Sequence, residues 1–396
     1  MNDLKQLTSE DKKTLSDPHS FYSYHNFDFK ITNRILPTQV VKNNSQTYYV
    51  VGLQFYLKYK PFFKKYRKPD DFFPQEEETF ILNFYTKSYK DATRNPDGNN
   101  AILTQIPKYK LDNNASNIIT SNSINDTNVS TGTIQSTNIT NIPDILEGSD
   151  NRVALILIHG FQSKNKKIYL QLAERFCKRG IPTLVYILPF HFERAPENSD
   201  FYKLLDLTDF MNILEFYRQS IIELRLLINY LKTIGFKKVG CMGFSIGGHY
   251  CNILSCVEEN MDFSIPMASK GALIPISKPS QNAKTTSTKS DSYNHENKKL
   301  NFYLMENHHY LVNPIYLKPK IDKHKILLIQ GLFDNRAPLP EVLKFRKAWD
   351  YPPAVWLPCD HFTFFLFNRL NIILATNFIR SHVLRQQTLT KKQKNL

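Results

Sequence analysis

The chain has 396 residues, enough for one large α/β domain with insertions or for two domains. Hydrophobic residues make up 41% of it and can fill a sizeable core. Its five cysteines are an odd number without C-x-x-C or metal-ligand spacing, which excludes a disulfide framework and favours reduced thiols in a cytosol-like compartment.

The charge is strongly positive, with 51 basic against 36 acidic residues and a net charge of +15. Such a balance suits a nucleic acid, an anionic membrane or an acidic substrate. Asn and Lys are abundant along the whole chain, however, and drift in composition is an alternative that would produce the charge without any partner. We therefore expect no nucleic-acid partner.

Neither end of the chain predicts passage into or across a membrane. The first 20 residues are polar and no apolar signal core follows, so we expect no leader sequence and a cytoplasmic location, with peripheral membrane contact as an option. The apolar run at 362–379 is interrupted by one Arg and three Asn residues, which favours a buried helix over a membrane span.

Residues 1–110 are expected to form an N-terminal extension and the early strands of a sheet. Residues 1–45 show little periodicity and are expected to wrap the surface or to be mobile. Alternation predicts a strand at 48–59, and further β-prone segments lie at 78–90 and 100–107.

Aromatic and basic residues interleave between positions 58 and 68. This segment could make weak contact with an anionic membrane, or it could be a solvated turn whose aromatics seal the edge of the core. The residues concerned are Lys58, Tyr59, Lys60, Phe62, Phe63, Lys64, Lys65, Tyr66, Arg67 and Lys68.

Low-complexity sequence divides the rest of the chain. Residues 111–142 are rich in Asn, Ser, Thr and Ile without helical period, and we expect a disordered insertion there. Residues 143–385 are expected to form the core domain, with a polar loop insertion at 279–297. Residues 386–396 form a basic tail that we expect to be frayed.

Strands and helices alternate through the core domain. Strands are expected at 153–158, 181–188, 239–242, 263–267, 325–329 and 354–357, with helices at 169–176, at 209–232, after residue 247, at 340–349 and after residue 361. This order predicts an α/β fold with a mostly parallel central sheet covered by helices on both faces. Functional groups of such folds gather at the carboxyl ends of the strands.

Gly-Phe-Ser-Ile-Gly at 243–247 stands between a predicted strand and a predicted helix. In a turn this sharp the flanking residues must lack side chains, which Gly243 and Gly247 satisfy. The pattern predicts a strained turn that exposes the hydroxyl of Ser245 as a nucleophile.

An acid and a base follow the nucleophile in the order Ser, Asp, His. Asp334 follows one buried strand and His361 follows the last strand. His361 is placed to take the proton of Ser245, and Asp334 to orient the imidazole. Asp360 is the rival acid, although its position next to His361 hinders contact with the far ring nitrogen.

His-Gly-Phe at 159–161 follows the strand at 153–158. The backbone N–H groups of Phe161 and Ile246 are the expected oxyanion hole. The plain alternative is a strand-to-helix turn without a catalytic role.

Taken together, residues 152–377 resemble the α/β-hydrolase superfamily. The Gly-Phe-Ser-Ile-Gly elbow, the loop from Leu188 to Arg194, and Arg218-Gln219 resemble one group in it, the abhydrolase domain-containing protein eighteen group and its microbial relatives. The resemblance implies a serine hydrolase of the α/β-hydrolase fold and names no substrate. The insertions at 111–142 and 279–297 depart from the common pattern of the superfamily.

Three residues near the expected site carry open alternatives. His191 and Arg194 could bind a carboxylate or phosphate of the substrate, or Arg194 could pair with an acidic neighbour as a structural contact. His249 favours a packing role over a catalytic one.

The sequence thus predicts hydrolysis of a carboxylic ester or thioester, with a small-molecule or lipid-like substrate, through an acyl-enzyme. No metal or cofactor is expected to be required. The alternatives are a prolyl-oligopeptidase-like peptidase and a catalytically silent scaffold at a membrane surface.

Overall fold

The computed structural model describes residues 7–24, 29–43, 46–57, 59, 61–63, 78–87, 153–161, 163, 165–195, 209–233, 235–272 and 291–394. The β-prone segment at 100–107 and the insertion expected at 111–142 lie outside these ranges, as do the basic side chains of 58–68.

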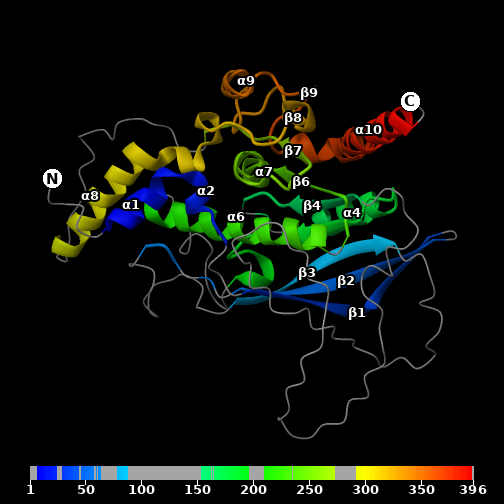
Figure 1. The fold of residues 1–396 in the computed structure, drawn as a ribbon, viewed down its shortest axis with the longest axis horizontal. Coiled ribbons are helices and arrows are strands. Elements are labelled where there is room, and N and C mark those ends of the chain that lie inside the picture. Colours follow the sequence, from blue (N-terminus) through cyan, green and yellow to red (C-terminus); the bar gives the residue numbers. More distant parts are fainter. Residues whose placement is uncertain are drawn as a thin grey trace, which may run out of the picture.

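Across the described residues, nine strands form one sheet of order β1-β2-β3-β5-β4-β6-β7-β8-β9. Their bounds are β1 Phe29–Asn43, β2 Gln46–Leu57, β3 Glu78–Lys87, β4 Val153–Ile158, β5 Thr183–Tyr186, β6 Lys238–Phe244, β7 Phe263–Met267, β8 Leu328–Gly331 and β9 Ala354–Leu357. Neighbouring strands from β5 to β9 pair in parallel, whereas β1, β2 and β3 form an antiparallel extension whose last strand pairs with β5 (Figure 1).

Helices connect the strands. The α-helices are α1 Ser9–Ser16, α2 Pro18–Phe21, α4 Lys166–Cys177, α6 Phe210–Thr233, α7 Ile246–Val257, α8 Asp291–His308, α9 Leu339–Ala348 and α10 Asn368–Lys394. Short 3-10 helices are η2 Phe192–Arg194, η3 His309–Val312, η4 Pro314–Tyr316, η5 Lys323–Lys325 and η6 Thr363–Phe367.

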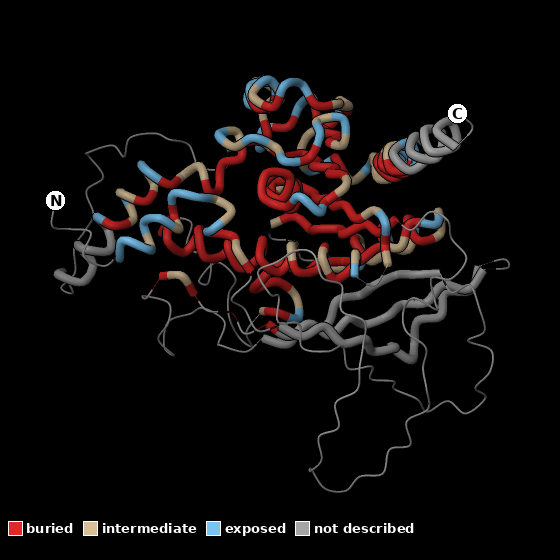
Figure 2. Tube along the Cα trace, in the orientation of Figure 1, coloured by how far each residue is buried: buried red, intermediate tan, exposed pale blue. Residues whose placement is uncertain are grey.

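Strand β4 shows why the sheet is covered on both faces. All six of its residues are buried, and successive side chains point to opposite faces of a strand. Ala154, Ile156 and Ile158 join the core packed against α6 and α7, while the alternate residues of β4 join a second core with α4 and α10. Both cores are buried in Figure 2. The predicted α/β-hydrolase architecture, a mostly parallel sheet between two helical layers, is confirmed.

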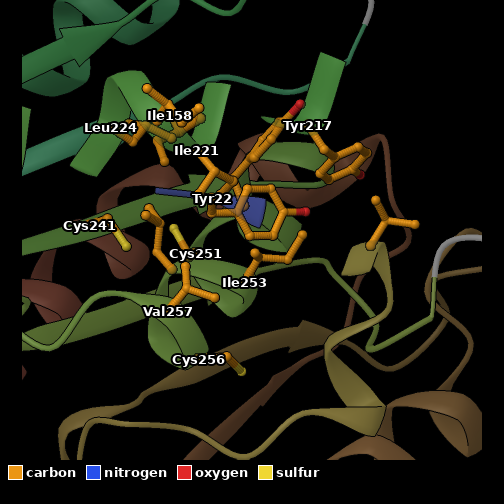
Figure 3. Close-up of a cluster of buried hydrophobic side chains, with 14 of the residues drawn as sticks. Tyr22, Ile158, Tyr217, Ile221, Leu224, Cys241, Cys251, Ile253, Cys256 and Val257 are labelled. Carbon is orange, nitrogen blue, oxygen red and sulfur yellow. The ribbon is translucent and has the colours of Figure 1, made fainter. Parts of the chain in front are cut away.

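Residues near the N-terminus are more ordered than the sequence predicts. Helices α1 and α2 and strand β1 occupy part of 1–45, and the side chains of Phe21 and Tyr22 are completely buried. Tyr22 lies in the core beside α6 and α7, together with Tyr217 and Ile221 (Figure 3). Periodicity could not predict α1 and α2, because each is short and has only one buried residue, Leu15 in α1 and Phe21 in α2.

Two helices begin or continue where other structure was expected. Helix α8 begins at Asp291, inside the polar range 279–297, and α10 continues to Lys394, through most of the expected tail. In the part of the chain that the structure describes, no helix is long and apolar enough to cross a membrane.

Candidate active site

Ser245 occupies a sharp turn between β6 and α7, with φ of 56° and ψ of −116°. A Cβ atom on Gly243 would lie 2.2 Å from the carbonyl group of Gly247, and one on Gly247 would lie 2.4 Å from the oxygen of Ile158. These contacts are too short for any side chain, so the two glycines are required by sterics. The turn predicted from the sequence is present, and Ser245 is only partly buried in it.

Ser245, His361 and Asp334 form one hydrogen-bonded chain. The Oγ of Ser245 lies 3.0 Å from Nε2 of His361, and Nδ1 of His361 lies 2.8 Å from Oδ2 of Asp334. Since an ionised carboxylate only accepts hydrogen bonds, Nδ1 of His361 donates to Asp334, and Nε2 is then left to accept from the hydroxyl of Ser245. The structure thus brings together three residues that lie far apart in the sequence.

Backbone donors fix the carboxylate of Asp334. Its Oδ1 accepts hydrogen bonds from the N–H groups of Arg336 and Ala337, each at 2.8 Å. Burial alone would raise the pKa of Asp334, but the hydrogen bonds from His361 and from these two amides outweigh it and lower the pKa. The side chain therefore faces His361 as a carboxylate.

Asp360, the rival acid, is engaged elsewhere. Its Oδ1 accepts from the backbone N–H groups of Phe362 and Thr363 and from the hydroxyl of Thr363, each at 2.8 Å. These bonds lower the pKa of Asp360, with the backbone bond from Thr363 as the first cause. Asp360 closes the turn that begins η6 and does not contact the ring of His361 as Asp334 does.

The loops that carry Asp334 and His361 are joined through their backbones. The N–H of Leu332 donates to the oxygen of Leu357 at 2.8 Å, and the N–H of Phe333 donates to the oxygen of Cys359 at 3.0 Å. A Cβ on Gly331 would lie 2.6 Å from that same Cys359 oxygen, so glycine lets the two loops approach. The distance between acid and base therefore depends on main-chain bonds.

The end of β4 packs against the turn at Ser245. A Cβ on Gly160 would lie 2.9 Å from the ring of Phe244, next to Ser245. The close approach of Gly247 to Ile158 brings the same two segments together. Phe161 and Ile246, the expected oxyanion donors, lie on these segments.

Tyr169, expected only as a core residue of a helix, has a second contact. Its hydroxyl accepts a hydrogen bond from the N–H of Gly160 at 3.0 Å and lies 3.1 Å from the hydroxyl of Ser163. Helix α4 thereby holds the turn after β4. No sequence signal distinguishes this tyrosine from its apolar neighbours.

His191 and Arg194 require a correction as substrate-binding residues. Both are buried, and the guanidinium of Arg194 forms two hydrogen bonds with the carboxylate of Glu223, at 2.8 and 2.9 Å. The ring of His191 packs 4.7 Å from that of His159, and its Nδ1 lies 2.8 Å from the oxygen of Pro189. Of the two roles that the sequence left open, Arg194 thus has the structural one, because it is paired with the buried Glu223 of α6.

His249 also lies in the interior. Its ring nitrogens lie 2.9 Å from the oxygen of Lys270 and 2.7 Å from that of Val312, and burial lowers the pKa of the ring. These contacts bind α7 to two neighbouring segments and agree with the packing role expected.

Two aromatics of the 58–68 segment are buried, and Phe62 between them is partly buried. Tyr59 is 1% exposed and Phe63 is 4% exposed. Carboxylate oxygens of Glu215 accept from the hydroxyl of Tyr59 and from the N–H of Phe63, each at 2.6 Å. These two aromatics therefore seal the core and do not face a membrane.

Large apolar side chains are exposed next to the reacting groups. Phe333 precedes Asp334 and is 69% exposed, and Phe362 follows His361 and is 71% exposed. Leu366, one turn farther along, is 81% exposed.

Among the described residues, no group of three His, Cys, Asp or Glu side chains gathers to hold a metal ion.

Comparison with known proteins agrees with this architecture. Residues 139–275 match the model of a family described as alpha/beta hydrolase domain containing 18. No sequence among the curated proteins matches the chain.

Several solved structures are similar to this chain at low identity. A protein from Thermus thermophilus is 16% identical, with 58% of this chain and 89% of that chain covered and a TM-score of 0.40. An esterase from Pyrococcus furiosus is 14% identical, with 59% and 84% covered and a TM-score of 0.38. A cold-adapted esterase from an Arctic intertidal metagenomic library is 10% identical, with 86% and 97% covered and a TM-score of 0.41. By its strand order, its elbow and the family match, the chain has the α/β-hydrolase fold and resembles the alpha/beta hydrolase domain containing 18 family.

Proposed function

We propose that the protein is a serine hydrolase that cleaves a carboxylic ester or thioester through an acyl-enzyme. The observation that carries the proposal is the hydrogen-bonded chain from Ser245 through His361 to Asp334, with Ser245 in a strained turn. Nucleophile, base and orienting acid in this order are the arrangement that activates a serine hydroxyl.

The proposed reaction has two steps. Ser245 Oγ bonds to the substrate carbonyl carbon as Nε2 of His361 takes the hydroxyl proton, and His361 returns that proton to the departing alcohol or thiol. Water then attacks the acyl-enzyme with His361 again as base, which releases the acid and restores Ser245. The N–H groups of Phe161 and Ile246 stabilise the oxyanion in each step, and an oxyanion donor of this kind is worth about 10²- to 10³-fold in kcat.

An apolar acyl group is the substrate feature that the surroundings favour. Phe333 and Phe362 flank the acid and the base and are largely exposed, and Leu366 extends this apolar surface. Covering such side chains with a hydrocarbon chain would contribute roughly 25 cal/mol per Å² of apolar area removed from water. We therefore expect kcat/KM to increase with acyl chain length.

A series of p-nitrophenyl esters from acetate to long-chain acyl groups tests the substrate, and labelling with a fluorophosphonate tests the nucleophile. Wild-type protein should be labelled and Ser245→Ala should not. A folded wild-type protein that neither reacts with the probe nor hydrolyses any ester would instead fit a scaffold role. Flat activity along the ester series in both wild type and Phe362→Ser would contradict the apolar acyl group.

Contact of 58–68 with an anionic membrane remains a separate proposal, now without Tyr59 and Phe63, because these two side chains are buried. Each basic residue near such a surface contributes roughly 1 kcal/mol. Sedimentation with phosphatidylserine vesicles should be weakened by salt and by changing Lys64, Lys65 and Arg67 to Glu. No sedimentation at low salt would contradict the contact.

A further inference from the structure

A buried ion pair lies behind the proposed oxyanion site. Arg194 and Glu223 have side chains with 0% exposure, and two hydrogen bonds join the guanidinium to the carboxylate. The hydroxyl of Tyr186 donates to Glu223 at 2.5 Å and the amide of Gln219 donates at 3.0 Å. So many donors fix the carboxylate, and the carboxylate in turn fixes Arg194.

The same guanidinium contacts the backbone after β5. Nη1 of Arg194 donates to the oxygen of Ile187 at 2.7 Å. The N–H of the same peptide group, which belongs to Leu188, donates to Nε2 of His159 at 3.0 Å. Because C=O and N–H point in opposite directions in a trans peptide, Arg194 on one side and His159 on the other hold this peptide plane.

The other ring nitrogen of His159 holds a second peptide group, the one between Gly160 and Phe161. A backbone N–H can only donate, so Nε2 of His159 accepts and the ring proton lies on Nδ1. Nδ1, 2.8 Å from the oxygen of Gly160, then donates to it. Burial is the main cause that lowers the pKa of His159 well below its usual value, which keeps the ring neutral and the tautomer single.

The oxygen of Gly160 belongs to the peptide group whose N–H is that of Phe161. Fixing this oxygen on the His159 side turns the N–H of Phe161 toward the opposite side. The strand-end contacts of Gly160 and Gly247 place the neighbouring turn of Ser245 against this segment.

The loop from Leu188 to Arg194, both of which take part in this series of hydrogen bonds, is strained. Phe190 and Phe192 have φ of 62° and 51°, a region that side-chain-bearing residues rarely adopt. Such residues persist where surrounding contacts over-determine them. Arg194, at the end of this loop, bonds to the oxygen of Ile187 and to Glu223, and the rings of His191 and Phe192 lie 4.7 and 5.0 Å from that of His159.

We propose that Arg194 and His159 are positioning residues that align the N–H of Phe161 with the oxyanion, through a chain of hydrogen bonds that starts at Glu223. Hydrogen bonds in series polarise one another, so the charge of Arg194 also strengthens the final donor. The proposal rests on the proposed hydrolase function and assigns to Arg194 a role other than substrate binding.

Two replacements of His159 separate its two bonds. The Asn amide reaches the position of Nδ1 and can still donate to Gly160. The Gln amide reaches the position of Nε2, where it can accept from Leu188 but cannot donate to Gly160. We expect His159→Gln to lower kcat by about 10- to 100-fold with KM within about twofold, because an aligned oxyanion donor acts in the transition state. His159→Asn should retain clearly more activity.

Arg194→Lys keeps the charge beside Glu223 but cannot bridge the carboxylate and the oxygen of Ile187 as Arg does. The matched control is Arg225→Lys, because Arg225 likewise bonds a carboxylate, that of Glu258, and a backbone oxygen, that of Tyr22. Arg194→Lys should lower kcat about tenfold and weaken binding of a trifluoromethyl ketone by the same factor. Arg225→Lys should lower Tm without either effect.

Crystal structures of His159→Gln and Arg194→Lys complete the test, since they report the orientation of the peptide between Gly160 and Phe161 without any assay. A rotated peptide with reduced kcat supports the proposal. Unchanged kcat in His159→Gln, equal kcat losses in both Arg→Lys variants, or an unmoved peptide overturns it. If wild type hydrolyses no ester, the proposed function fails, and the orientation of the peptide still decides whether Arg194 and His159 position it.

Discussion

Two sets of polar side chains lie in this molecule under opposite conditions. Ser245, Asp334 and His361 lie at the ends of parallel strands, where Ser245 and His361 are partly exposed and Asp334 is buried behind His361. Glu215 and Glu223 on α6 are completely buried, and each carboxylate accepts several hydrogen bonds. The first set keeps access to a substrate, whereas the second set is enclosed by its own protein partners.

This difference in exposure implies that the first set matters mainly for the reaction and the second set mainly for the stability of the fold. A buried polar group costs about 1–3 kcal/mol when it loses its partner, so groups such as Glu215 are constrained by folding. A partly exposed group at a strand end can be replaced with little loss of stability, because water takes the place of the missing partner. The two sets should therefore respond to mutation in opposite ways.

Ser245→Ala should give the largest effect on turnover, a loss of about 10⁴-fold or more, because no other group at the turn can form the acyl-enzyme. The Tm should stay close to that of wild type, since the hydroxyl is not a core contact. Ester hydrolysis and a thermal melt check both expectations. Substantial activity in the folded variant would remove Ser245 as the nucleophile.

Asp334→Asn should lower kcat by about 10³- to 10⁴-fold, because an amide in place of the carboxylate favours the wrong tautomer of His361. The control is Asp360→Asn, which keeps an oxygen for the amides of Phe362 and Thr363 and should cost less than tenfold. Steady-state kinetics of both variants decide the assignment. A larger loss in Asp360→Asn would reverse it.

The strand-end set could be predicted from the sequence because each member follows a short apolar segment that predicts a strand. The continuous apolar run of β4 predicts a strand buried on both faces, the glycines around Ser245 fit a sharp turn between a strand and a helix, and chain order then assigns Asp334 and His361. Periodicity similarly predicted α4 and α6 to within a few residues, and it placed β7 and β9 without error.

The α6 set could not be predicted, because each contact joins residues that only the fold brings together. Glu215 bonds the hydroxyl of Tyr59, 156 residues earlier. Glu223 bonds Arg194, which the sequence equally allowed as a substrate ligand. Nothing in the local pattern indicates which carboxylate an arginine will meet, and the same holds for the contact of Tyr169 with Gly160.

Glu215→Gln should show the converse of Ser245→Ala. One carboxylate oxygen that accepts a hydrogen bond becomes a donor, so we expect a loss of about 1–3 kcal/mol in unfolding free energy and a Tm lower by several degrees. The kcat of the folded fraction should be unchanged. The matched control is Glu193→Gln, because Glu193 forms an ion pair with Lys166 but is 58% exposed and should contribute little. Equal Tm losses in the two variants would contradict the comparison.

The smallest expected effects concern the pH dependence of stability. The contribution of Asp334 should increase with pH, whereas that of Glu215 should decrease. Hydrogen bonds lower the pKa of Asp334 in the folded protein, so its stabilising contribution is present above the unfolded pKa near 3.8 and is lost as the pH falls through the folded pKa. Burial raises the pKa of Glu215, so the folded protein holds that proton more firmly, and stability is lost as the pH rises from the unfolded pKa near 4.5 through the folded pKa.

Differences in Tm between wild type and each Asn or Gln variant isolate these contributions, because the other carboxyl groups titrate alike in both proteins. The Tm advantage of wild type over Asp334→Asn should widen between pH 2.5 and 4.5, since only wild type gains the ionised Asp334. Its advantage over Glu215→Gln should narrow as the pH rises above 4.5, because only wild type then has to keep a carboxyl group charged in the core. Two advantages that change in the same direction with pH would show that the hydrogen bonds around Glu215 outweigh its burial, and that the α6 set is ionised like the strand-end set.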